Sequence, residues 1–137
     1  MNKLHIEQTE LTPEIVLDPG NKEFHIKGNS RPEDVRELYY PVIEWLAEYR
    51  HFLQNDGNSV YTEDDPLIVQ FYLAYFNSST AKFLYDIIHE IRNIKEDGVP
   101  VEVTWHYDED DFDMYEAGKT YEASINIPTT LVPIIGA

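Results

Sequence analysis

Residues 67–91 read LIVQFYLAYFNSSTAKFLYDIIHEI, and the apolar period of this stretch changes once, at residues 77–80. Before the change, residues 68–76 form a short run of mostly aromatic and β-branched side chains without Gly or Pro, which is typical of a strand buried on both faces. After the change, apolar side chains recur at steps of three and four, as on one face of a helix. They are Ala81, Leu84, Ile87, Ile88, Ile91 and Ile94. The stretch therefore predicts a strand that runs directly into a helix.

Four polar residues stand at this junction: Asn77, Ser78, Ser79 and Thr80. Side chains of these types are favoured as helix N-caps because their oxygens accept hydrogen bonds from the unpaired N–H groups of the first turn. We therefore expect the helix to start at or just after Asn77. Two interpretations stay open for the other hydroxyls. They are solvated and do nothing further, or one of them carries a phosphate that the helix N-terminus stabilises.

The composition predicts one folded domain spanning residues 1–137, since 42% of the residues are hydrophobic. A net charge of −16 disfavours binding to nucleic acid or to an anionic membrane surface, and it favours basic protein surfaces or cations as partners. The absence of cysteine excludes disulfides, thiolate catalysis and cysteine metal sites. No signal-peptide pattern or membrane-length apolar run is visible, so we expect a cytoplasmic protein.

The N-terminal part predicts two or three short strands within residues 4–28, with an antiparallel hairpin around residues 19–21. His25 falls on the polar phase of the second hairpin strand, so we expect its side chain to be exposed. Residues 30–33, SRPE, match a capping box and predict the start of a long helix that continues to about residue 53. Pro41 is expected to kink or split this helix, and Trp45 to pack on the sheet.

The C-terminal part predicts a half-buried strand over residues 101–106, a short helix over about 111–118, a last strand over 121–127 and an apolar tail over 128–137 that packs back or orders a dimer. The most acidic stretch lies between the first strand and the helix. We interpret it as the solvated start of that helix, with a docking surface for a basic partner or a cation site as the alternatives. Its acids are Asp108, Glu109, Asp110, Asp111, Asp113 and Glu116.

The chain carries no catalytic pattern that its spacing supports. The six glycines are scattered and form no phosphate-binding loop, and the five histidines show no ligand spacing. Ser78 or Ser79 as a nucleophile would need a base, and nothing in the spacing brings the one candidate, His106, to either of them. We therefore expect no catalytic residue, no metal and no cofactor, and a protein that is not an enzyme.

Three motifs in this order resemble the SiaC family of bacterial regulatory phosphoproteins. They are FHIKGNSRPEDVRELYYPVIEWL at residues 24–46, LAYFNSSTAKFLYDIIHEI at residues 73–91 and VEVTWHYDEDDFDMYEAGKTYE at residues 101–122. The likeness extends over about residues 4–127. It implies an α/β fold similar to the STAS domain of anti-sigma-factor antagonists, with a mixed sheet of about five to six strands flanked by two main helices and one short helix.

The resemblance also implies a function as a partner switch. In this family the unphosphorylated form binds and activates a diguanylate cyclase, which links the switch to cyclic di-GMP and biofilm formation. A dedicated Ser/Thr kinase and a metal-dependent Ser/Thr phosphatase would set the phosphorylation state. The alternative is a constitutive acidic interaction or dimerisation module that is not phosphorylated.

The family's phosphoacceptor, commonly a threonine, directly follows the junction asparagine, and this position is Ser78 here. Ser79 and Thr80 remain as alternatives. The expected partner-binding residues are Asn77, Ser78, Ser79, Thr80 and Lys82.

Overall fold

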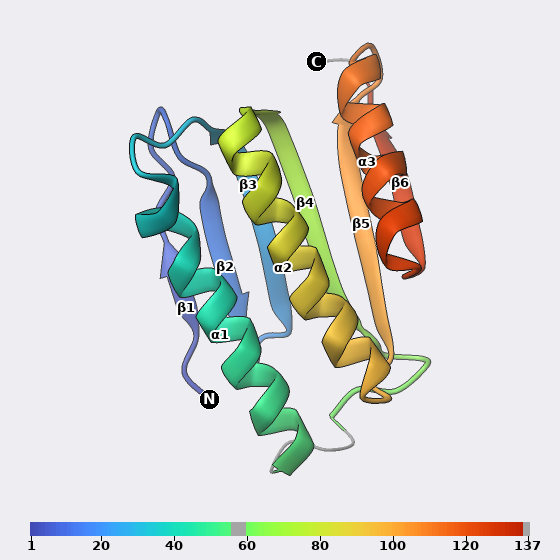
Figure 1. The fold of residues 1–137 in the computed structure, drawn as a ribbon. Coiled ribbons are helices and arrows are strands. Elements are labelled where there is room, and N and C mark those ends of the chain that lie inside the picture. Colours follow the sequence, from blue (N-terminus) through green and yellow to red (C-terminus); the bar gives the residue numbers. More distant parts are fainter. Residues whose placement is uncertain (56–59, 136–137) are drawn as a thin grey trace.

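The computed structural model describes residues 1–55 and 60–135, and in them a six-stranded mixed sheet carries three helices (Figure 1). The strands are β1 (Leu4–Ile6), β2 (Glu14–Asp18), β3 (Glu23–Ser30), β4 (Leu67–Phe76), β5 (Val101–Asp108) and β6 (Thr129–Ile134). The helices are α1 (Val35–Asn55), α2 (Ser78–Glu96) and α3 (Phe112–Ile125). Within these residues, no helix combines the length and apolar character that crossing a membrane requires. The predicted mixed α/β fold is confirmed.

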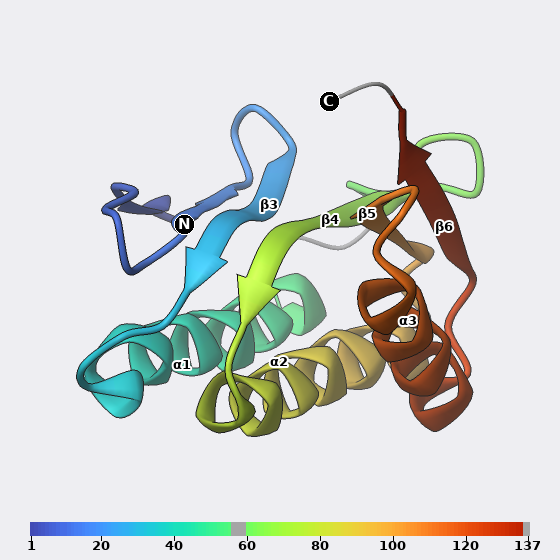
Figure 2. The same ribbon diagram turned by 90° about the horizontal axis from the view of Figure 1, so that it is seen from above.

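All three helices cover the same face of the sheet (Figure 2). The strand order follows the sequence from β1 to β6, and β3, β4, β5 and β6 run parallel to one another. Each helix therefore connects two neighbouring parallel strands and moves the chain one strand further in the same direction. Because such crossovers are almost always right-handed, successive crossovers in one direction place their helices on one face. The opposite face of the sheet stays open.

This one-sided arrangement corrects the prediction that β4 is buried on both faces. The β4 side chains that face the helices are buried, whereas Ile68 is exposed and Gln70 and Tyr72 are half-buried on the open face. The buried set is Leu67, Val69, Phe71 and Leu73. A strand with many aromatic and aliphatic residues can be covered on both faces, or it can have one face open to solvent that still carries some apolar side chains. The composition of the strand alone does not distinguish these two cases.

A β-bulge interrupts β4 just before the junction. Gly28 pairs with Leu73, but Asn29 pairs with Tyr75, so Ala74 is an extra residue in β4. A bulge of this kind reverses the alternation of side chains beyond it. Tyr75 is consequently exposed, and Phe76 turns toward the helices, where its ring meets Trp105 edge-on at a centroid distance of 6.3 Å.

The predicted N-terminal strands and their hairpin are confirmed, since β2 and β3 pair antiparallel. The expected exposure of His25 is wrong, because its side chain is only 13% exposed. The imidazole of His25 instead pairs with Glu14 on β2, whose Oε1 lies 2.7 Å from the Nε2 of His25. The hydrogen bond from His25 holds the pKa of the Glu14 carboxyl below its usual value.

The first long helix begins later than the capping box predicted. The Oδ1 of Asp34 accepts hydrogen bonds from the backbone N–H groups of Arg36 and Glu37, both at 3.1 Å, so Asp34 is the cap and α1 starts at Val35. Ser30 matches the sequence pattern of a cap but is the last residue of β3. Its backbone is already paired in the sheet, which leaves its hydroxyl free for another role.

Helix α1 is a single helix, and the expected split at Pro41 is wrong. Packing of a long apolar face on the sheet offsets the loss of one backbone hydrogen bond. The predicted position of Trp45 is confirmed: the side chain is buried, and its ring lies 6.2 Å from that of Phe24 on β3.

The predicted strand over residues 121–127 is wrong. Helix α3 is capped by Asp111 and continues through residue 125, so residues 121–125 are helical. The apolar tail packs back on the sheet, which was one of its two expected positions, but it does so as strand β6, which pairs with β5; its residues 136–137 lie outside the described residues. The sequence suggested a helix end at Gly118, but this glycine is a packing position, since a Cβ there would lie 2.5 Å from the Cδ1 of Trp105.

Candidate functional site

The predicted junction lies where the parallel strands β3 and β4 end and the helices α1 and α2 begin. Figure 1 shows the first turns of both helices at the same edge of the sheet. A backbone hydrogen bond of 3.2 Å joins the end of β3 to the start of α2 there: the N–H of Asn77 donates to the carbonyl of Ser30. The hydroxyl groups at the start of α2 are therefore fixed to the end of β3.

Asn77 caps α2, as predicted. Its backbone is extended, with φ −89° and ψ 175°. Its Oδ1 accepts two hydrogen bonds, one from the backbone N–H of Thr80 at 3.0 Å and one from the hydroxyl of Ser79 at 2.9 Å. One asparagine side chain thus satisfies a first-turn donor and also engages the Ser79 hydroxyl.

The three hydroxyls of the junction lie in different environments. Thr80 is fully buried, and its Oγ1 lies 2.9 Å from the Oγ of Ser30, which in turn lies 2.6 Å from the hydroxyl oxygen of Tyr39. Burial raises the pKa of Tyr39 to about 12. This chain of hydroxyls ties β3, α1 and α2 together and keeps Thr80 away from solvent.

Replacing Ser30 by alanine is expected to destabilise the fold by about 1–2 kcal/mol, because it leaves the buried hydroxyl of Tyr39 without its partner. Urea denaturation followed by circular dichroism would measure this change. The double variant Ser30→Ala/Tyr39→Phe removes both members of the pair and should lose less stability than the two single losses added together. Additive losses would show that the two hydroxyls do not depend on each other.

Ser78 is exposed, and the hydrogen bonds found in residues 1–55 and 60–135 include none made by its hydroxyl. Ser79 is also exposed, but its hydroxyl takes part in the cap. Lys82 is exposed one turn further along α2, on the same side as Ser78, and its Nζ lies 5.4 Å from the ring centroid of Phe83. The first turn of α2 thus presents one free hydroxyl close to a cation.

Helix α3 holds the first turn of α2 from the other side. The hydroxyl of Tyr121 donates a hydrogen bond of 2.9 Å to the carbonyl of Ala81, and burial raises the pKa of Tyr121 to about 12. The local sequence pattern does not identify Tyr121, Tyr39 and Ser30 as supports of the junction. A tyrosine in an apolar pattern is a signal for such contacts, because a buried phenol needs a hydrogen-bond partner.

His106 does not serve the junction serines. Its ring stacks on that of Tyr72 at a centroid distance of 3.7 Å on the open face of the sheet, and its Nε2 lies 3.2 Å from the Oγ1 of Thr104. Burial lowers the pKa of His106. In the described part of the chain, no hydrogen bond joins this histidine to Ser78 or Ser79, so neither serine has a placed base.

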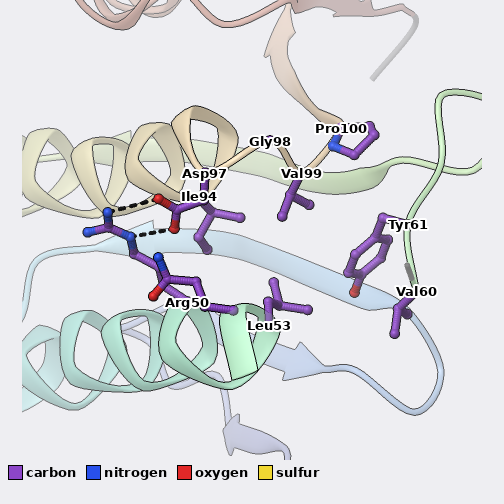
Figure 3. A pocket seen from close by; sticks show the side chains of 10 residues that line it. Arg50, Leu53, Val60, Tyr61, Ile94, Asp97, Gly98, Val99 and Pro100 are labelled. Atoms are coloured by element: carbon purple, nitrogen blue, oxygen red, sulfur yellow. Dashed lines mark hydrogen bonds and ion pairs between the residues drawn. The ribbon is translucent and has the colours of Figure 1, made fainter. Parts of the chain in front are cut away.

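A pocket of about 450 Å³ lies at the other end of the helices, between the C-terminal turns of α1 and α2 (Figure 3). Its charged groups and its tyrosine hydroxyl are already paired. Arg50 donates two hydrogen bonds to Asp97, of 2.7 and 3.0 Å, and the hydroxyl oxygens of Tyr61 and Tyr49 lie 2.6 Å apart. The guanidinium of Arg50 holds the pKa of the Asp97 carboxyl below its usual value. This pocket offers a ligand little unpaired polar chemistry.

The acidic stretch forms an open hollow around the turn from β5 to α3. Residues 108–113 and Ile134 line it, and Asp111 uses its carboxylate to cap α3 through the N–H of Met114 at 3.0 Å. Among residues 1–55 and 60–135, three or more potential metal ligands do not come together anywhere. As predicted, this stretch starts a helix.

The family model for SiaC, described as SiaC family regulatory phosphoprotein, matches residues 6–134 of the chain. The chain belongs to the SiaC family. This SiaC family member is also 31% identical, over 128 residues, to an uncharacterised protein of Pseudomonas aeruginosa strain UCBPP-PA14. The alignment covers 93% of the chain and 94% of that relative.

Solved structures of SiaC from Pseudomonas aeruginosa share the fold of this SiaC family member. The structure of the diguanylate cyclase SiaD in complex with its activator SiaC gives a TM-score of 0.80 at 27% identity, and covers 96% of this chain and 99% of that chain. Apo-SiaC gives a TM-score of 0.79 at 29% identity with the same coverage. A further SiaC structure gives 0.81 at 28% identity, and covers 98% of this chain and all of that chain. The family resemblance and the predicted regulatory function are thereby confirmed.

Proposed function

We propose that this SiaC family member binds and activates a diguanylate cyclase, and that reversible phosphorylation of Ser78 switches the binding off. SiaC of Pseudomonas aeruginosa, which has the same fold, is the activator of the diguanylate cyclase SiaD. We choose Ser78 as the phosphate acceptor because the three junction hydroxyls lie in different environments. Thr80 is buried, Ser79 is engaged in the cap, and Ser78 is exposed at the start of α2.

A phosphate on Ser78 is compatible with the fold. It adds about −1.5 to −2 charges near neutral pH, at a helix end where the dipole and free N–H groups favour an anion. The first turn of α2 contains no acidic residue that would repel it. The modification is therefore expected to change what the surface binds and to leave the structure folded.

The proposed partners also include a dedicated Ser/Thr kinase that adds the phosphate and a metal-dependent phosphatase that removes it. In this scheme the chain is a regulator and does not itself catalyse a reaction, which agrees with the absence of a placed base near the junction serines in the described residues. Of the five expected partner-binding residues, Asn77, Ser78, Ser79 and Lys82 remain in the proposal, whereas Thr80 is left out because its side chain is fully buried. The scheme puts the chain in the cytoplasm, where the GTP used by a cyclase is found.

Mass spectrometry of the protein from its native cells tests the choice of acceptor. Peptides that include residues 76–82 are expected to carry phosphate on Ser78 in part of the population, and the fraction should change with growth conditions. A Ser78→Ala variant should lose this phosphate, whereas Ser79→Ala should keep it. Phosphate on Ser79 or Thr80 would contradict the assignment. If no condition yields phosphate while the chain still binds the cyclase, the constitutive interaction module is the better description.

A further inference from the structure

We propose that the partner of this chain presents an acidic surface with an apolar centre, and that it docks on the end of the molecule where α1 and α2 begin. We call this end the junction face and define it as residues 29–40 and 75–85. The proposal rests on the proposed function and specifies the chemistry of the partner. It differs from the expectation drawn from the net charge alone, which favoured basic partners.

The junction face is electrically unlike the rest of the chain. It contains three cations and three acids, so its formal charge is zero, whereas the remaining sequence holds seven cations and 23 acids and carries the whole net charge of −16. The cations are Arg31, Arg36 and Lys82, and the acids are Glu33, Asp34 and Glu37. Long-range repulsion would keep an acidic partner away from other parts of the surface and leave this end as its approach.

The three cations of the junction face are also free to bind. In the described part of the chain, none of them forms an ion pair, whereas Lys22, Arg50, Arg92 and Lys119 each pair with a carboxylate. Among the acids of the face, Asp34 accepts two backbone hydrogen bonds through its Oδ1 as the cap of α1, whereas Glu33 and Glu37 are exposed and form no ion pair in residues 1–55 and 60–135. Unpaired guanidinium and ammonium groups are suited to carboxylates of a partner, and arginine is enriched at protein interfaces.

Exposed aromatic side chains supply the apolar part of the face. Tyr40, Tyr75 and Tyr85 are 49%, 48% and 42% exposed, and among the described residues only one other phenylalanine, tyrosine or tryptophan, on α3, is as exposed. Each is held by a neighbour. Tyr40 meets Phe83 edge-on at 5.5 Å, Tyr85 meets the ring of a histidine on α2 at 4.7 Å, and Arg31 lies 5.5 Å from the ring of Tyr75. Tyrosines that are already oriented lose little freedom on binding, which is why they often anchor interfaces.

Phosphorylation of Ser78 would make this neutral face negative. The added charge of about −1.5 to −2 converts a neutral end into a negative one, so that an acidic partner would meet repulsion there as elsewhere. Lys82 lies four residues after Ser78 on the same side of α2, where side chains of opposite charge attract each other. The phosphate would therefore also occupy a cation that the partner needs. The partner is released because the charge of the face changes, without a change of fold.

Charge reversal tests the proposal. Calorimetry would measure the binding of the diguanylate cyclase to the wild-type chain, to Arg31→Glu and to Lys82→Glu at 50, 150 and 500 mM salt. Each reversal is expected to weaken binding about tenfold at low salt, and the difference should shrink as salt screens the charges. Lys119→Glu on α3 is the matched control and should bind within twofold of wild type. Circular dichroism would verify that every variant is folded.

The possible outcomes separate the two proposals. Wild-type binding that the reversals leave unchanged or strengthen would overturn the acidic partner and leave the proposed function standing. If the wild-type chain binds no cyclase, the proposed function fails, and a titration with hexaglutamate followed by NMR decides the inference alone. Amide shifts confined to the junction face would support it, and absent or scattered shifts would overturn it. A dimer of the chain that Tyr85→Ala dissociates would also overturn it, since a second copy would then cover the face.

Discussion

Replacement of Ser78 by glutamate is expected to weaken binding of the cyclase by about a hundredfold or more, whereas Ser78→Ala should bind like the wild type. Placing like charges against each other in an interface costs several kcal/mol, and each 1.4 kcal/mol corresponds to a factor of about ten in affinity. The substituted residue lies at the first position of α2, within the junction face, and Lys82 follows it one turn later on the same side of the helix. Calorimetry and the rate of cyclic di-GMP formation by the bound cyclase would both report the loss.

The control for this experiment is Ser124→Glu, which adds the same charge at an exposed serine on α3. It should leave binding nearly unchanged, because it lies outside the junction face. Ser78→Glu itself should stay folded, since an acid in the first turn of a helix interacts favourably with the dipole. Equal binding by the alanine and glutamate variants would contradict the charge mechanism. Weak binding by both would mean that the partner contacts the hydroxyl itself.

Gly118→Val is expected to destabilise the fold by about 3 kcal/mol, at the upper end of the usual cost of overpacking a core. A Cβ at this position would lie 2.5 Å from the Cδ1 of Trp105 and 2.8 Å from a methyl carbon of Leu131. The indole cannot easily withdraw, because its Nε1 donates a hydrogen bond of 3.0 Å to the carbonyl of Met114. Any gain from replacing a glycine inside a helix is at most about 1 kcal/mol and cannot compensate.

Ala123→Val in the same helix provides the matched control. This side chain is exposed, so the change should cost only about 0.5–0.7 kcal/mol through the lower helix propensity of valine. Urea denaturation of both variants would measure the difference in the free energy of unfolding. If the two substitutions cost the same, the close approach of α3 to Trp105 does not constrain position 118.

The central strand, the helix after it and the cap between them could be predicted because each depends on local sequence. The change of apolar period falls at Asn77, and the cap uses the side chain that the statistics of helix ends favour. The buried position of Thr80 also had a local signal. Thr80 precedes Leu84 and Ile87 by four and seven residues, which is the spacing of one helix face, so its hydroxyl had to point inward once the helix began at Ser78.

The wrong predictions depend on contacts between distant segments. Ser30 has the sequence of a cap, but pairing of β3 with β4 extends the strand through it. The strand expected at residues 121–127 is a helix because Gly118 lets α3 lie on Trp105, 13 residues earlier in the chain. The open face of the sheet follows from the order of the strands, which the apolar pattern of β4 does not contain.

The bulge at Ala74 decides which side chains at the end of β4 face the helices. Because Ala74 is an extra residue, Tyr75 and Phe76 lie opposite Asn29 and Ser30. If the same residues paired without a bulge, Ala74 and Tyr75 would take these two positions, so Tyr75 would turn toward Trp105 and Phe76 would turn away from it. Deleting Ala74 would instead leave the pairing of Tyr75 and Phe76 unchanged, and the cap at Asn77 would stay where it is. The end of β4 is therefore expected to tolerate the loss of this one residue, whereas an added residue would need a further irregularity to keep the start of α2 in place.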